Sequence, residues 1–104
     1  MSTVKPAIGK PALDAMTDAS LAWTREERKT APPGLLSLGE QAAAIITEQF
    51  PGQGETAGRV VMAVVQMIEG MECQVHGPEG RILGQLSGIL ALAAEQVVRE
   101  AGER

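Results

Sequence analysis

Few residues in this 104-residue chain carry side chains that could perform chemistry, and one group of them lies close together in the sequence. Cys73 and His76 lie three residues apart, a spacing used by one half of a metal site, and Glu69 and Glu72 precede them as further possible ligands. The chain holds one cysteine and one histidine, so no second Cys or His completes a zinc ligand set. We therefore expect a helix end followed by a polar turn here, with no metal and no cofactor bound.

The same residues also fall short of an enzyme active site. A nucleophile formed by Cys73 and His76 needs an orienting third group and an oxyanion site, and the sequence indicates neither. The glycine-rich segment 52–58 resembles a phosphate-binding loop in composition, but it lacks the lysine of a P-loop and a preceding strand. We predict that the protein is not an enzyme. A small enzyme that uses Cys73 and His76 is the least favoured alternative.

The charge and the aromatic content disfavour nucleic acid as a ligand. Nine Lys and Arg against 13 Asp and Glu give a net charge of -4, which is the wrong sign for binding phosphates by counterion release. Trp23 and Phe50 are the only aromatic side chains available to stack on unpaired bases. We expect no direct binding of nucleic acid.

The cysteine content and the apolar stretches predict a cytoplasmic protein without membrane contact. A single cysteine cannot form an intrachain disulfide, and the N-terminal residues MSTVKPAIGKPAL lack the continuous apolar region of a secretory signal. The most apolar stretch, residues 82–94, would form a helix about 20 Å long. That length is short of the roughly 30 Å hydrocarbon core of a bilayer.

Apolar residues recur at helical spacing through most of the chain, which predicts an all-α fold. We expect a small bundle of three to four helices in a single helical domain, residues 11–104. Prolines and glycines make residues 1–10 a poor candidate for regular structure, so this segment is interpreted as a flexible N-terminal arm.

Breaks in the pattern predict where the helices begin and end. Helix one is expected over about residues 11–29, and a Pro-Pro-Gly linker at 31–34 then stops it, because consecutive prolines remove backbone donors. The rest of the bundle is expected over about residues 37–101. Ser37 and Glu40 have the spacing of a capping box, which would begin the second helix.

Helix one is predicted to have one apolar and one charged face. The apolar stripe consists of Ala12, Met16, Ala19 and Trp23. The opposite face, which we expect to be solvated, carries Asp14, Asp18, Arg25 and Arg28. Because the Pro-Pro-Gly break separates this helix from the rest, Met16, Ala19 and Trp23 are the candidate protein-binding residues, with Trp23 as the aromatic anchor.

The later helices each carry two adjacent apolar seams, more than a helix with one buried face needs. In the third helix these seams are Val60, Val64, Met67 and Met71, and beside them Val61, Val65 and Ile68. Gly80, Gly84 and Gly88 recur every four residues, either as a ridge for close helix packing within or between chains or as incidental glycines. We expect a homodimer, with packing residues Val64, Met67, Met71, Gly84 and Gly88.

These surfaces predict a non-enzymatic, protein-binding regulator that sequesters a partner protein or blocks its assembly. In size, acidity and helicity the chain looks like small bacterial antiactivators, which bind transcriptional activators such as those of quorum sensing. This likeness implies a transcriptional regulator as the partner, and it is one of overall profile rather than of a shared motif. The alternative is a chaperone or assembly adaptor that masks a helical partner through the same apolar surface.

Overall fold

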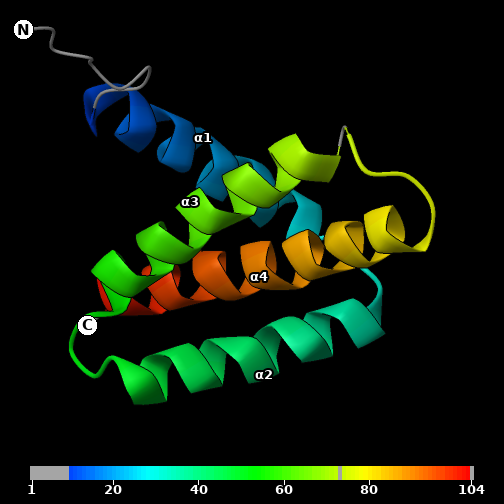
Figure 1. Cartoon of the computed structure of the whole chain (residues 1–104). Coiled ribbons are helices and arrows are strands. Elements are labelled where there is room, and N and C mark those ends of the chain that lie inside the picture. Colours follow the sequence, from blue (N-terminus) through cyan, green and yellow to red (C-terminus); the bar gives the residue numbers. More distant parts are fainter. Residues whose placement is uncertain (1–9, 73, 104) are drawn as a thin grey trace, which may run out of the picture.

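Four helices make up the part of the chain that the computed structural model describes, residues 10–72 and 74–103 (Figure 1). They are α1 (Lys10–Arg28), α2 (Pro33–Gln49), α3 (Gly54–Glu72) and α4 (Pro78–Gly102). No strand occurs in these residues, and the small all-α bundle is confirmed. The predicted N-terminal arm, residues 1–10, lies outside the described residues except for Lys10, which opens α1.

The break between α1 and α2 is shifted from its predicted position. Pro33 is the first residue of α2, a position that suits proline because no backbone donor is needed there. The linker therefore covers residues 29–32 rather than 31–34. Ser37 lies inside α2, where its hydroxyl accepts a hydrogen bond from Gln41 at 3.3 Å, so the predicted capping box was wrong.

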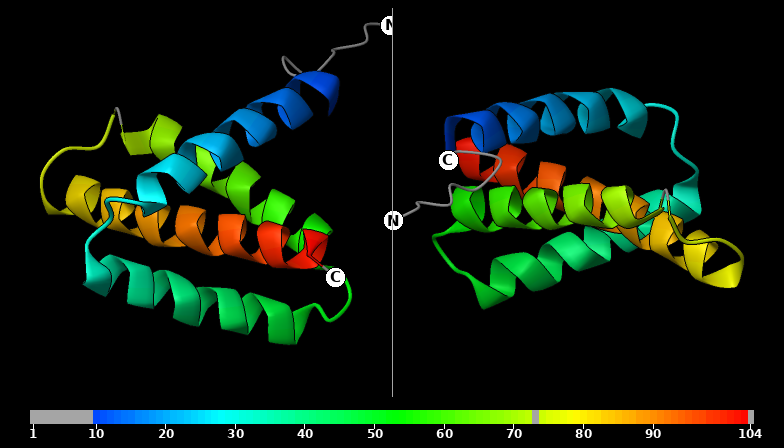
Figure 2. Two further views of the ribbon diagram at one scale, coloured as in Figure 1. Left: turned by 180° about the vertical axis from the view of Figure 1, so that it is seen from behind. Right: turned by 45° about the horizontal axis from the view of Figure 1, so that its top comes forward.

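The central helix of the bundle is α4 (Figure 1). The chain reverses direction between α2 and α3 and again between α3 and α4, so α3 runs antiparallel to α4 and α2 runs parallel to it. α1 crosses the α3–α4 pair at an incline and packs against it much less extensively than α2 and α3 pack against α4 (Figure 2).

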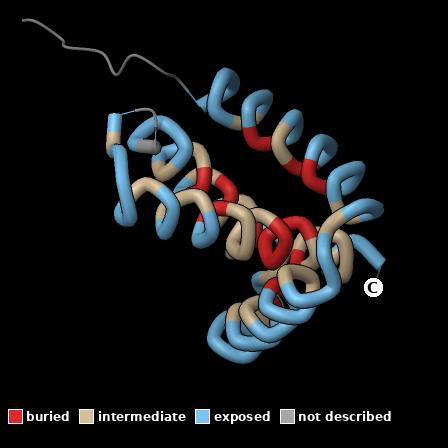
Figure 3. The backbone as a smooth tube through the Cα atoms, turned by 90° about the vertical axis from the view of Figure 1, so that its right-hand side faces the viewer, coloured by how far each residue is buried: buried red, intermediate tan, exposed pale blue. Residues whose placement is uncertain are grey.

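Two clusters of buried apolar residues hold these helices together, and the buried positions face the centre of the bundle (Figure 3). The cluster that joins α1, α3 and α4 contains Leu21, Met62, Val65 and Ala94. The cluster that joins α2 and α4 contains Ala43, Ala93 and Val97. Small side chains dominate the surface of α4 at these contacts, which lets its neighbours approach closely.

Close approach to α4 depends on glycines of α2 and α3. A Cβ atom on Gly58 would lie 2.5 Å from Val98 Cγ2 and 2.9 Å from the Ala94 carbonyl oxygen. A Cβ atom on Gly39 would lie 2.9 Å from Leu92 Cβ. These two glycines therefore lie at close contacts of α2 and α3 with α4.

The glycine ridge predicted on α4 makes different contacts. A Cβ atom on Gly80 would meet the Val75 carbonyl oxygen at 2.5 Å, so Gly80 accommodates the loop that precedes α4. A Cβ atom on Gly88 would lie an ordinary 3.9 Å from the Leu35 methyl carbons. Neither glycine is a point of close helix approach within the chain.

A pair of substitutions in α3 tests the glycine packing. We expect Gly58→Ala to lower the free energy of unfolding by about 1–2 kcal/mol, because the clash with α4 outweighs the better helix propensity of alanine. Gly70→Ala is the control, since its Cβ atom would meet no atom within 4 Å. This control should raise the free energy of unfolding by up to about 1 kcal/mol. Urea denaturation measures both, and changes of the same sign would contradict the packing.

Candidate functional site

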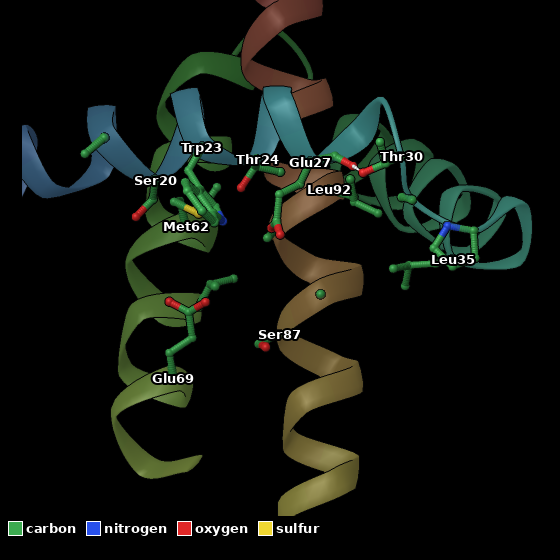
Figure 4. A pocket seen from close by; sticks show the side chains of 16 residues that line it. Ser20, Trp23, Thr24, Glu27, Thr30, Leu35, Met62, Glu69, Ser87 and Leu92 are labelled. Carbon is green, nitrogen blue, oxygen red and sulfur yellow. Dashed lines mark hydrogen bonds between the residues drawn. The ribbon is translucent and has the colours of Figure 1, made fainter. Parts of the chain in front are cut away.

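A cleft of about 630 Å³ lies beneath α1, between α3 and α4 (Figure 4). Its floor is apolar: Leu35 and Ala91 are partly exposed there, whereas Met62, Val65 and Leu92 border it as core residues that are at most 3% exposed. Trp23 of α1 lines the cleft although its side chain is 67% exposed. The volume falls within the range of typical ligand pockets, which are also mostly apolar.

The polar lining of the cleft comes from all three helices. Ser87 of α4 donates a hydrogen bond to the Gly84 carbonyl at 3.0 Å, and the Ser20 hydroxyl of α1 accepts one from the Gln66 amide at 2.9 Å. Among the described lining residues, only Glu27 and Glu69 are charged. Their carboxylates point into the cleft from α1 and α3 (Figure 4). The cleft therefore combines an apolar floor with acidic groups.

Ion pairs fasten the N-terminal half of α1 to α3. Arg59 of α3 donates to Asp18 at 2.7 Å, and its guanidinium lies 3.7 Å from the Asp14 carboxylate. A hydrogen bond from Lys10 lowers the pKa of Asp14 more than burial raises it, and the charges of Lys10 and Arg59 lower this pKa further. This end of the helix is thus held by charged contacts at the bundle surface.

The C-terminal half of α1 is fastened by a cluster around Glu95 of α4, whose side chain is 0% exposed. Arg28 Nε donates to Glu95 Oε1 at 2.9 Å, and Arg28 Nη2 donates to the Leu92 carbonyl at 2.7 Å. Arg25 Nε and Arg99 Nε donate to Glu95 Oε2 at 3.2 and 3.1 Å. Three arginines thus pair with one buried carboxylate and donate hydrogen bonds to both of its oxygens.

These contacts correct part of the prediction for the charged face of α1. The Arg25, Asp14 and Asp18 side chains each form an ion pair but remain 55%, 46% and 67% exposed, as a solvated face requires. Arg28 differs, because it is 21% exposed against Glu95. The positions of α1 that are buried are Thr17, Leu21 and Thr24. The stripe that α1 turns inward therefore contains two threonines beside Leu21, and the ion pairs with Glu95 and Arg59 form alongside it.

The Glu95 cluster makes stability depend on pH. Burial raises the pKa of Glu95, but hydrogen bonds and charges from Arg99, Arg28 and Arg25 outweigh this effect and lower the pKa below its ordinary value. The carboxylate therefore contributes stability at neutral pH, and that contribution is lost as the pH falls through the lowered pKa.

We expect the free energy of unfolding of the wild type to be higher than that of Glu95→Gln near pH 7. This difference should shrink as the pH falls from about 5 to about 3. Urea denaturation at several pH values measures this difference. A difference that stays constant, or grows on acidification, would show that Glu95 does not have a lowered pKa.

The structure exposes the predicted protein-binding residues. Met16, Ala19 and Trp23 all lie exposed on one face of α1, together with Ala12. Ala19 and Trp23 line the cleft, whereas Met16 does not. The predicted apolar stripe is therefore a surface of the isolated chain, and one end of it borders a cavity.

The predicted dimer residues fall on two separate surfaces. Val64, Met67 and Met71 are exposed on α3 and do not line the cleft, whereas Gly88 lines it. Gly84 is half-buried on α4. The second seam of α3 is the one that packs inward, since Val65 is buried and Val61 packs against the same cluster.

The structure describes only some of the residues that were considered for chemistry. Cys73 and the side chain of Glu72 lie outside the described residues, and His76 is exposed. No group of three His, Cys, Asp or Glu residues in the described ranges is arranged to hold a metal ion. Within the same ranges, no helix carries an apolar stretch that could cross a bilayer.

Sequence reasoning missed the acidic lining of the cleft. Glu27 follows Trp23 by four residues, which places both on the same side of α1, so helical spacing offered a signal for that pair. Glu69 was considered only as a metal ligand or a solvated residue. Its position opposite α1 depends on how α1 crosses the bundle, and no local pattern reports that crossing.

Comparisons with known proteins do not assign the fold or the site. No protein-family model matches the chain, no curated protein matches it at a significant level, and no solved structure does so either.

Proposed function

We propose that the protein is a non-enzymatic regulator that captures a helix of a partner protein in the cleft beneath α1 and so blocks that partner's assembly. The observation that carries this proposal is Trp23, which is 67% exposed beside a cleft with an apolar floor. Exposed tryptophan is unfavourable in water, and buried tryptophan contributes strongly at protein interfaces. Grooves of this kind bind the apolar face of an amphipathic helix.

The partner that we propose is a transcriptional regulator, so that the protein acts as an antiactivator, for example in quorum sensing. The net charge of -4 supports action through a protein rather than through DNA. Sequestration needs no catalytic group, only a surface that competes for the partner's own interface. A chaperone would use the same cleft, but it would later release its partner, which would then join its own assembly and become active.

We propose further that the protein is a homodimer formed through the outer face of α3. Val60, Val64, Met67 and Met71 follow one another along this face, and Met67 is 63% exposed. A second copy would cover this apolar stripe. Because none of these residues lines the cleft, both clefts of the dimer would stay open.

Met67→Glu should convert the dimer to a monomer, because the substitution places a charge in the apolar interface. The matched control is Met16→Glu, which introduces the same charge at an exposed methionine of α1. Sedimentation velocity at micromolar concentration measures the mass of each. A monomeric wild type, or a Met67→Glu variant that still dimerises, would contradict the α3 interface.

Site-specific photo-crosslinking in cells tests the proposed function. A photoreactive amino acid at Ala19, which is exposed and lines the cleft, should capture one partner, whereas the same group at exposed Ala44 of α2 should not. The purified partner should then bind Trp23→Ala at least about tenfold more weakly than wild type. It should also lose its own assembly when the wild-type protein is added.

Two results would overturn the proposal. One is equal crosslinking from Ala19 and Ala44, which would show contact without a specific cleft. The other is a partner that keeps its assembly and activity in the complex, which would exclude sequestration.

A further inference from the structure

The charges in the cleft select among partner helices. The accessible apolar lining includes Trp23, Leu35 and Ala91, and two acidic groups, Glu27 of α1 and Glu69 of α3, extend into the cleft. No lysine or arginine is found among the described lining residues. A ligand that fills the cleft therefore places apolar atoms on the floor and meets negative charge at the walls.

The neighbouring cations of α1 do not neutralise Glu27. Arg25 and Arg28 bind Glu95, and Lys29 forms an ion pair with Glu26 at 3.2 Å. The Glu27 carboxylate makes no ion pair within the described part of the chain. Its charge is therefore available to a ligand that enters beneath α1.

Trp23 adds a second preference for positive charge. Lys and Arg side chains are attracted to the face of an indole ring, and their aliphatic stems pack on apolar surface. Trp23 and Glu27 lie one helical turn apart on α1, and both line the cleft. A cation at this position can contact the ring and the carboxylate together.

We propose that the cleft binds a basic amphipathic helix, whose apolar residues contact Trp23, Leu35 and Ala91, and whose Lys or Arg side chains pair with Glu27 and approach the negative charge of Glu69. This inference rests on the proposed capture of a partner helix and specifies the chemistry of that helix. Apolar anchors three or four residues apart fit the floor, with basic residues flanking them. Complementary charge also speeds association and rejects acidic helices.

The test uses two dye-labelled synthetic peptides of about 15 residues, long enough to form a helix on binding. Both carry leucine at helical spacing, one with lysine and the other with glutamate at the remaining positions. Fluorescence anisotropy with the purified full-length protein measures their affinities. We expect saturable binding of the Leu–Lys peptide and at least tenfold weaker binding of the Leu–Glu peptide.

Matched variants separate the cleft from the overall acidity of the protein. Glu27→Gln combined with Glu69→Gln should weaken the Leu–Lys peptide roughly fivefold. Glu40→Gln combined with Glu48→Gln removes the same charge from exposed positions on α2 and should change the affinity less than twofold. Circular dichroism checks that both double variants keep the helical content of the wild type.

Each alternative result has a distinct meaning. If both double variants weaken binding of the Leu–Lys peptide equally, the binding reflects only the overall negative charge of the protein. That result would overturn the proposal. Equal affinities of the two peptides would overturn the charge selection but leave helix capture in place. No binding by either peptide would also overturn the proposal, while crosslinking from Ala19 decides the proposed function separately. If a peptide dissociates the protein dimer, this result would show that a second copy of the chain occupies the cleft. The proposal would then be overturned as well.

Discussion

Arg28→Met is expected to lower the free energy of unfolding by about 3 kcal/mol. The substitution keeps an apolar stem of similar length but removes two hydrogen bonds, one to the Glu95 carboxylate and one to the Leu92 carbonyl. Glu95 is then left with Arg25 and Arg99, which bind only its other oxygen. A buried carboxylate with incomplete pairing is costly, and this loss is a large share of the stability of a small domain.

Arg81→Met is the matched control for this experiment. Arg81 is exposed near the start of α4 and makes no ion pair within the described residues. Its substitution should change the free energy of unfolding by less than about 0.5 kcal/mol. Urea denaturation at neutral pH measures both variants, and similar losses would mean that the Glu95 cluster does not anchor α1.

Leu21→Ala is expected to lower the free energy of unfolding by about 2–4 kcal/mol. Leu21 is the one large apolar side chain of α1 that is buried, and it packs with Met62, Val65 and Ala94. Its removal leaves a cavity at the crossing of three helices. Because α1 packs less extensively than the other helices, this loss should act first on the docking of α1.

Hydrogen exchange distinguishes local undocking from general destabilisation. In Leu21→Ala, amide protection should fall most in α1 and least where α3 packs against α4. Leu13→Ala is the control, because Leu13 lies on the same helix but is exposed, and it should cost less than about 1 kcal/mol. Uniform loss of protection across all helices would contradict a separately docked α1.

The two substitutions bear on function because α1 forms one wall of the cleft. One leucine and the ion pairs of Glu95 and Arg59 hold this helix over α3 and α4. Loss of these contacts would therefore remove one wall of the cleft.

Much of the fold could be predicted from the sequence because local signals mark the helices. Apolar periodicity and the Pro and Gly breaks predicted three to four helices, and the structure has four, although Pro33 begins α2 earlier than the Ser37 cap suggested. The doubled seams of α3 were also visible in the sequence. Which seam packs inward was not predictable, since it depends on how α3 meets α4.

The face that α1 turns inward could not be predicted from its own residues. Periodicity identifies Ala12, Met16, Ala19 and Trp23 as a stripe, but these side chains are exposed. The inward face is set by Glu95, which lies 67 residues after Arg28 in the chain. Burial of that carboxylate is a tertiary effect, because a glutamate followed by Arg99 one turn later also fits a solvated helix.

The central claim is tested most directly by the fluorescence emission of Trp23 when the protein binds the partner that crosslinking has identified. Trp23 is the only tryptophan in the chain, so with a tryptophan-free segment of the partner its fluorescence reports the cleft alone. Occupation of the cleft removes water from the indole, and we predict a saturable shift to shorter wavelength with the same midpoint as binding. A partner that binds with full affinity while the emission stays unchanged would contradict capture in the cleft.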